Sequence, residues 1–209
     1  LAPVTQVATV AFVLNGAPNL AAANARELIA LAKAKPGSIN YASSGLGSSP
    51  HLAGELLKMM TGIEMVHVPY KGGGPAMTDV IAGRVDLLFS TILQALPMLQ
   101  AGKMKALGVG GLKRAVAAPD IPTLDESGVA GYDFTNWFGV LAPSATPKPV
   151  IATLQREIAR HLDSAELRQR MQTEGAEPVG GTPEAFGQLI RFDIDKMARI
   201  VKAANVKLN

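Results

Sequence analysis

Apolar positions in the first two-thirds of the chain alternate between short extended runs and stretches with helical spacing. A helix is predicted from Asn24, because Glu27 follows it at the spacing of a capping box and an apolar stripe runs on to Ala32. Further helices are predicted to begin at Pro50, Pro75 and Ile92. The predicted strands cover residues 12–14, 39–43, 65–69, 85–89 and 106–109. Strands that alternate with helices of about ten residues indicate β-α-β crossovers and a mainly parallel sheet.

The pattern changes after Gly111. Residues 115–133 are rich in Ala, Pro, Gly and Asp, and they predict an irregular crossing segment with one short helix near Asp125. A strand is predicted at residues 135–142. Three amphipathic helices then complete the chain, beginning after Pro147, at a cap on Asp163 and at Thr182. We therefore expect a compact α/β unit over residues 13–133, with terminal helices that belong to a second unit.

The loop between the strand at residues 39–43 and the helix at Pro50 carries small polar residues and no charge. Its stretch YASSGLGSSPHL (residues 41–52) contains four serines and two glycines, with no lysine or arginine. If Ser49 is the N-cap, the first amides of the helix have no helical partner. Leu52 stands where a capping box would place Glu or Gln. An external anion such as a carboxylate can therefore complete this helix end.

The small side chains of this loop suit the close approach of an anion. Gly45 and Gly47 let the backbone come near a ligand, and the hydroxyls of Ser44, Ser48 and Ser49 add donors. The same composition is also typical of an ordinary strand–turn–helix connection in which the serines only cap the helix.

Particular residues exclude the common phosphate-binding motifs. A P-loop ends in Gly-Lys-Ser/Thr, whereas no lysine lies between Lys35 and Lys58. A Rossmann fingerprint needs a third glycine where Pro50 stands. The loop at residues 71–75 (KGGGP) has its lysine before the glycines, which favours a tight turn that precedes a helix.

No catalytic, metal or cofactor site is predicted. Ser48 and His51 are close in sequence, but the Gly-x-Ser-x-Gly pattern of a nucleophile elbow surrounds neither Ser48 nor Ser49. His67 and His161 have no acidic partner at metal-ligand spacing, and the chain has no cysteine. A hydrolase that uses the anion-binding loop stays open as an alternative.

Charge and hydropathy limit the partners of this 209-residue chain. The net charge is only +3, with Lys and Arg scattered among Asp and Glu, so nucleic acid is not an expected partner. No window of about 18 uncharged apolar residues occurs, so the chain is not expected to span a membrane. The sequence opens on Leu1 rather than Met, and we interpret residue 1 as an internal position of a longer chain.

Several spaced motifs resemble one family. They are YASSGLGSSPHLAGELL, VHVPYKGGGPAMTDVIAGRVDLLF, ALPMLQAGKMKALGV and LKRAVAAPDIPTLDESGVAGYDFTNWFGVLAPSATP, in this order. Together they resemble the Bug family of extracytoplasmic solute receptors, the substrate-binding components of tripartite tricarboxylate transporters. The likeness extends over essentially the whole chain.

The resemblance implies an α/β, two-lobed periplasmic-binding-protein-like fold whose first lobe is incomplete in this chain. Residues 1–12 would be a remnant of that first lobe, and residues 13–133 the complete second lobe. Residues 134–209 would supply a hinge strand and the C-terminal helices of the first lobe. A Pro-Gly-Gly loop that the family carries in the first lobe has no counterpart in this sequence.

The resemblance also implies a ligand site. The loop would bind a ligand carboxylate through the residues Ser43, Ser44, Gly45, Gly47, Ser48 and Ser49. Segments 12–16 and 134–141 match the hinge strands, which places Trp137 near the cleft. Ser90 and Thr91 stand where relatives commonly carry Asp or Asn followed by Leu-Pro, and they take over the polar role there.

We therefore expect a periplasmic receptor, without catalysis or cofactor, that binds a small organic carboxylate such as a di- or tricarboxylate, an amino acid or an aromatic acid. Its partners would be the membrane permease subunits of the transporter. Two alternatives remain: the hydrolase named above, and a receptor fragment that binds nothing and associates through exposed sheet edges.

Overall fold

The computed structural model describes residues 1–206. Its strands are β1 (Ala2–Gly16), β2 (Ile39–Ser43), β3 (Met65–Pro69), β4 (Leu87–Thr91), β5 (Lys105–Val109), β6 (Thr135–Ala142) and β7 (Ala176–Pro178). Its helices are α1 (Ala25–Ala34), α2 (Ser49–Thr61), α3 (Gly73–Ile81), α4 (Ile92–Gln100), α5 (Lys148–Leu162), α6 (Ala165–Thr173) and α7 (Pro183–Ala203). Helices and strands alternate as far as β5, as the apolar pattern predicts.

The central sheet has the strand order β3-β2-β4-β1-β5, and β6 and β7 join it through β1. β2 lies parallel to β3 and β4. β1 runs antiparallel to both β4 and β5, so the four short strands of this order all point the same way. The predicted α/β class with a mostly parallel sheet is confirmed.

β1 is the longest strand, and it belongs to both groups of strands. Its first part, as far as Ala11, pairs with β6, and residues 8–10 also pair with β7. From Phe12 onward the same strand pairs with β4 and β5. The prediction of a short strand at residues 12–14 was wrong in length, because the small and polar residues of the preceding stretch conceal its extended conformation.

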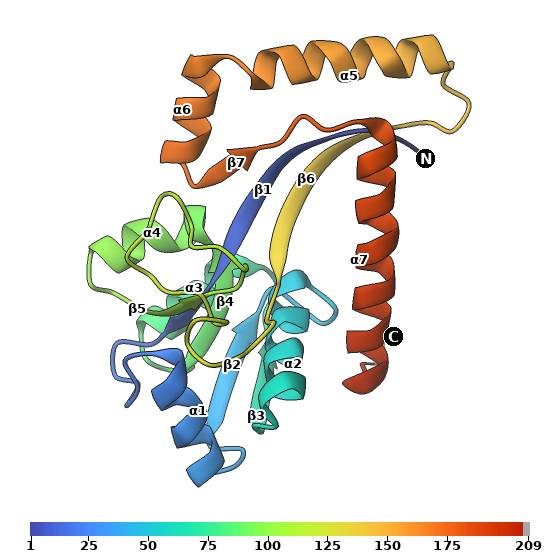
Figure 1. Cartoon of the computed structure of the whole chain (residues 1–209). Coiled ribbons are helices and arrows are strands. Elements are labelled where there is room, and N and C mark those ends of the chain that lie inside the picture. The colour runs from blue at the N-terminus through green and yellow to red at the C-terminus, as the bar shows by residue number, and fades with distance from the viewer. Residues whose placement is uncertain (207–209) are drawn as a thin grey trace.

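β1 and β6 run side by side between two groups of elements (Figure 1). At one end lie β7, α5 and α6, and at the other lies the sheet of β2 to β5 with its helices. α7 runs alongside this strand pair and packs against both β1 and α2. The division into residues 1–12, 13–133 and 134–209 stays a prediction.

Two predicted helix caps were wrong by one residue. Ser48, not Ser49, is the N-cap of α2, so Pro50 is the second helical residue. Ser164, not Asp163, is the N-cap of α6, because Asp163 is still needed as the C-cap of α5. The cap predicted at Asn24 is confirmed, and its side chain accepts the amide of Glu27.

The segment that crosses between β5 and β6 has turns where a short helix was predicted near Asp125. The Asp125 carboxylate accepts a hydrogen bond from the amide of Gly131 at 2.7 Å. Gly128 and Gly131 both adopt positive φ angles, which interrupts helical propagation after a single turn.

Close approach between α2 and β2 sets the position of the loop that joins them. Tyr41 of β2 is 1% exposed, and its ring lies against Gly54 of α2. A Cβ atom added at Gly54 would lie 2.5 Å from this ring, well inside van der Waals contact. Only glycine at this position allows the helix to pack at its present distance from the sheet.

We expect Gly54→Ala to lower the thermal midpoint, since overpacking a filled core costs about 1–3 kcal/mol. Gly74→Ala is the matched control, because an added Cβ there meets nothing within 4 Å and α3 gains helix propensity. Scanning calorimetry of both variants checks the prediction. Equal midpoints for Gly54→Ala and the unmodified chain would contradict it.

Candidate functional site

The loop between β2 and α2 folds back on itself. Gly45 and Gly47 have φ angles of +133° and +74°, which are strained for other residues. The Ser48 hydroxyl donates to the Gly45 carbonyl at 2.7 Å, and the Ser48 amide donates to the same oxygen at 3.2 Å. The loop carbonyls therefore satisfy Ser48 and leave the next amides of the helix free.

The N-terminus of α2 presents unpaired donors. Across residues 1–206, the amides of Ser49 and His51 make no hydrogen bond, and Pro50 between them has no amide hydrogen. No acidic residue stands in the first turn of α2, and the Ser48 side chain accepts no amide of the helix. The positive end of the helix dipole is thus open to an anion, as the sequence predicts.

A cavity of about 420 Å³ lies at this helix end. Its lining residues are Phe12, Ser44, Ser48, Ser49, Pro50, Gly73, Leu88, Phe89, Ser90, Thr91, Gln94 and Asn136. Five of the nine predicted site residues are among them: Ser44, Ser48, Ser49, Ser90 and Thr91. No charged side chain from the described part of the chain contributes to this lining, so its polar character comes from hydroxyl, amide and backbone groups.

Ser90 offers the cavity an oriented hydroxyl. Its oxygen accepts a hydrogen bond from the Asn15 side-chain amide at 3.0 Å, and both residues are buried. Asn15 also donates to the Val13 and Leu88 carbonyls, which fixes its position. Within residues 1–206 the Ser90 hydroxyl hydrogen has no acceptor. It is therefore available to a ligand oxygen in the cavity.

A second hollow of about 470 Å³ adjoins the first, because Ser49 and Asn136 line both. Trp137, predicted to lie near the cleft, lines this second hollow. Its ring packs edge-on against Phe186 at 5.2 Å, and its indole nitrogen donates to the Asp193 carboxylate. The indole is thus held rigidly and presents an apolar ring to the hollow.

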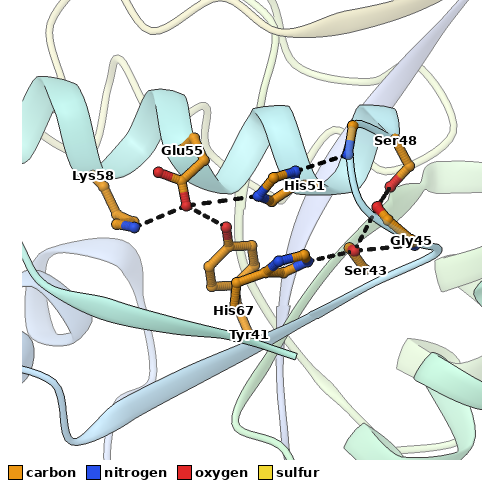
Figure 2. A network of polar contacts seen from close by, with 9 residues as sticks. Tyr41, Ser43, Gly45, Ser48, His51, Glu55, Lys58 and His67 are labelled. Atoms are coloured by element: carbon orange, nitrogen blue, oxygen red, sulfur yellow. Dashed lines mark hydrogen bonds and ion pairs between the residues drawn. The ribbon is translucent and has the colours of Figure 1, made fainter. Parts of the chain in front are cut away.

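Two histidines, the buried His51 and the half-buried His67, contact the loop (Figure 2). The Gly47 amide donates to Nδ1 of His51 at 3.0 Å, and Nε2 of His67 lies 2.6 Å from the Ser43 hydroxyl. Ser43 in turn accepts the Gly45 amide at 3.1 Å. The two imidazole rings stack with their centroids 3.9 Å apart. Side chains from α2, β2 and β3 therefore hold both loop glycines.

The charges beside this pair come from α2. Glu55 lies 3.9 Å from His51 and 2.8 Å from the ammonium of Lys58, and it accepts the Tyr41 hydroxyl at 2.5 Å. Burial lowers the pKa of His51, and the Glu55 carboxylate opposes this shift. Burial, with the neighbouring His51 as the next cause, lowers the pKa of His67 to about 4. Both rings are neutral at neutral pH.

The remaining predicted site residues lie around the cavity rather than in its wall. Ser43 is fully buried and holds the loop, while Gly45 and Gly47 shape it through their backbone. Sequence reasoning missed Asn136, Gln94 and Asn15. Only Asn136 gave a signal, as a polar residue beside Trp137 in a predicted strand. His67 was considered as a metal ligand and dismissed as one, and its link to Ser43 became visible only through strand pairing.

The part of the chain that the structure describes holds no cluster of three or more His, Cys, Asp and Glu side chains suited to a metal ion. In the same residues, no helix combines the length and apolar character needed to cross a membrane. Hydrogen-bond donors, rather than metal ligands, therefore characterise the cavity.

A two-part α/β fold with a neutral, donor-lined cavity at a helix end is typical of solute-binding proteins. A family model described as "Tripartite tricarboxylate transporter family receptor" matches residues 1–206, and the chain belongs to this family. The resemblance to Bug receptors is confirmed. The family is one of receptors rather than enzymes, in agreement with the prediction.

Three known proteins illustrate the similarity. BugT of Bordetella pertussis is 34% identical over 208 residues, which cover 100% of this chain and 64% of BugT. The structure of R. palustris Rpa4515 with adipate matches with a TM-score of 0.89 and 35% identity. MatC from Rhodopseudomonas palustris with bound malate matches with a TM-score of 0.82 and 29% identity. This chain aligns over 98% and 95% of its length with those two structures and spans 69% of each.

We expect stability to fall as the pH is lowered from about 6.5 towards about 4. His67 has a lower pKa in the folded chain than in the unfolded one, so the unfolded state binds more protons in this window. The stabilisation is complete above the ordinary histidine pKa of 6.5 and is lost as the pH falls towards 4. Thermal midpoints measured across this range check the prediction.

His67→Gln removes this titration and keeps a nitrogen near Ser43, so its midpoint should decline less steeply with acid. His161→Gln is the control, because His161 lies exposed on α5. Identical pH profiles for His67→Gln and the unmodified chain would show that the buried pair does not control acid stability.

Proposed function

We propose that this chain is a periplasmic receptor that binds the carboxylate of a small organic acid in the cavity at the N-terminus of α2. One observation carries the proposal: Ser49, whose amide is unpaired, and Ser90, whose hydroxyl has no acceptor within residues 1–206, both line a cavity without charged side chains in the described part of the chain. The acid would be a di- or tricarboxylate, an amino acid or an aromatic acid.

Neutral donors suit a reversible receptor. A carboxylate accepts several hydrogen bonds, and each bond from a neutral donor to a charged group contributes about 1.5–3 kcal/mol. A few such bonds support useful affinity without a buried ion pair, whose desolvation cost can exceed its attraction. The ligand can then be released when the receptor opens.

The ligand body would extend from the cavity into the adjoining hollow beside Trp137. Ser49 and Asn136 stand at the junction, and the Trp137 ring offers an apolar face to a methylene chain or an aromatic ring. The adipate of Rpa4515 and the malate of MatC support a carboxylic acid of this size.

Location and partners follow from the family. A receptor of the tripartite tricarboxylate transporters would act in the periplasm and deliver its ligand to the membrane permease subunits. Closure of two lobes around the ligand, with β1 and β6 as the crossing strands, would create the form that those subunits recognise.

The hydrolase alternative is disfavoured by geometry. The Ser48 hydroxyl donates to the Gly45 carbonyl, and His51 uses Nδ1 to accept the Gly47 amide, so these two side chains do not form a nucleophile–base pair. Ser43 and His67 are close enough for such a pair, at 2.6 Å, but Ser43 is fully buried and out of reach of a substrate.

Ligand binding is tested by a panel of mono-, di- and tricarboxylates and amino acids, with thermal shift as the screen and calorimetry for affinity. We expect Ser90→Ala to weaken binding about tenfold, because one charge-assisted hydrogen bond is lost. Asn15 keeps its two carbonyl acceptors in this variant, so the fold tolerates the change. Gly47→Val should abolish binding, since valine is strained at a φ of +74°.

Ser38→Ala is the matched control, because Ser38 is exposed and bonds only the carbonyl of Lys35 before β2. It should bind the ligand as the unmodified chain does. If Ser90→Ala and Gly47→Val both leave affinity unchanged, the cavity is not the ligand site.

Two further measurements separate the alternatives. We expect no turnover of ester or phosphate substrates, because neither Ser48 nor Ser49 in the cavity wall is paired with a base within the described residues. Hydrolysis that Ser48→Ala abolishes would favour the enzyme. Light scattering with and without ligand tests the associating fragment, for which we would observe oligomers and no thermal shift with any acid.

A further inference from the structure

We propose that His51 is a positioning residue of the carboxylate-binding loop, and that the loop holds its ligand only while the stacked His51–His67 pair is uncharged. This inference rests on the function proposed above. It adds that acid releases the ligand through the protein, in addition to any protonation of the ligand itself.

The contact between His51 and Gly47 defines the protonation state that the loop requires. Nδ1 of His51 accepts the Gly47 amide at 3.0 Å, and only an imidazole without a proton on Nδ1 can accept it. The ring proton of neutral His51 therefore resides on Nε2, the nitrogen that lies 3.9 Å from the Glu55 carboxylate. A second proton would place an N–H on Nδ1, directly against the N–H of Gly47.

Gly47 is the residue whose orientation matters for binding. Its φ of +74° turns the chain into the helix, and the next residues are Ser48 and Ser49, both in the cavity wall. The unpaired amide of Ser49 follows two positions later. Loss of the His51 acceptor would free this turn, and the donors would no longer converge on one ligand oxygen pair.

His67 contacts the start of the loop. Its Nε2 lies 2.6 Å from the Ser43 hydroxyl, which accepts the Gly45 amide. Because the His51 and His67 rings stack at 3.9 Å, a charge on either ring raises the energy of a charge on the other. The Ser43 hydroxyl itself donates to the Gly45 carbonyl at 3.0 Å, so Nε2 of His67 donates to Ser43 and this contact persists when His67 gains a proton. The pair resists protonation, and the contact that a proton breaks is the one between His51 and Gly47.

The groups that face the pair come from three elements. α2 supplies Glu55 and Lys58, whose opposite charges form an ion pair at 2.8 Å, and β2 supplies the Tyr41 ring, 5.0 Å from His67. β3 supplies His67 itself. Glu55 attracts a proton on His51 and Lys58 repels it, while burial of both rings disfavours the charged form.

Binding and protonation must then oppose each other. A ligand that requires the ordered loop favours the neutral pair, so ligand binding shifts the titration of His51 to lower pH. By the same linkage, lowering the pH weakens the binding of the ligand. This reciprocity gives two independent measurements.

The first measurement needs no ligand. In the full chain labelled with ¹⁵N, the Gly47 amide resonance is followed with the His51 ring resonances from about pH 7.5 to about pH 4. We expect both to move with one midpoint. In His51→Asn, whose side-chain oxygen takes the place of Nδ1 and does not titrate, the Gly47 resonance should stay in place. His161→Asn, on the exposed face of α5, should behave as the unmodified chain.

The second measurement uses adipate, with malate as an alternative probe, at about pH 7.5 and about pH 5. Protonation of the probe affects all variants equally, so the comparison isolates the protein. We expect the unmodified chain to lose more affinity than His51→Asn between the two pH values. His51→Leu, which lacks any acceptor, should bind about tenfold more weakly already at the higher pH.

The outcomes are separable. The inference is wrong if the Gly47 resonance does not shift as His51 titrates. It is also wrong if the unmodified chain and His51→Asn lose the same affinity for adipate. If no acid of the wider panel binds, but the Gly47 amide resonance still shifts with the titration of His51, the proposed function is wrong. The coupling between the His51 ring and the loop is then still supported. Should the substituted chains not fold, the resonances of the unmodified chain still decide.

Discussion

β1 connects the two groups of strands because one continuous backbone supplies hydrogen-bonding partners to both. Its first part pairs with β6 and β7, and from Phe12 onward it pairs with β4 and β5. Phe12 lies in the cavity lining, and Asn15 of the same strand orients Ser90. The strand that joins the two parts of the fold therefore also supplies part of the proposed ligand site.

The site itself depends on packing beneath it. α2 approaches β2 closely at Gly54 and Tyr41, and the Tyr41 ring lies beside both histidines that contact the loop. Each imidazole contacts the loop through one nitrogen, Nδ1 of His51 at Gly47 and Nε2 of His67 at Ser43, and neither ring lines the cavity. The cavity wall is left with small hydroxyl groups and free amides. The uncharged cavity wall is thus supported by two histidines that do not belong to its lining.

Local signals allowed much of the fold to be predicted from the sequence. The capping box at Asn24 and Glu27, the alternating apolar runs and the Gly-Ser loop each depend on neighbours within a few residues. The full length of β1 was missed because its alternation is carried by Ala, Thr and Val, whose burial depends on β6. The turn at Asp125 was mistaken for a helix because its carboxylate bonds Gly131 across six positions.

The family resemblance supplied what local patterns could not, namely that Ser90 and Thr91 belong with the loop. The structure brings them together, because β4 is the parallel neighbour of β2 and their ends meet at one edge. His67 and Asn15 escaped prediction for the same topological reason. His67 reaches Ser43 across the β2–β3 pairing, and Asn15 reaches Ser90 from a strand 75 positions away in sequence.

The uncharged lining of the cavity has a consequence for how a ligand arrives. Fixed charges at a binding site attract an oppositely charged solute over about one Debye length, and dissolved salt weakens that attraction. Partial charges on amides and hydroxyls act only at contact. For the ligand site proposed above, the lining would therefore add little attraction at a distance, and selectivity would arise from contacts made after the solute has entered.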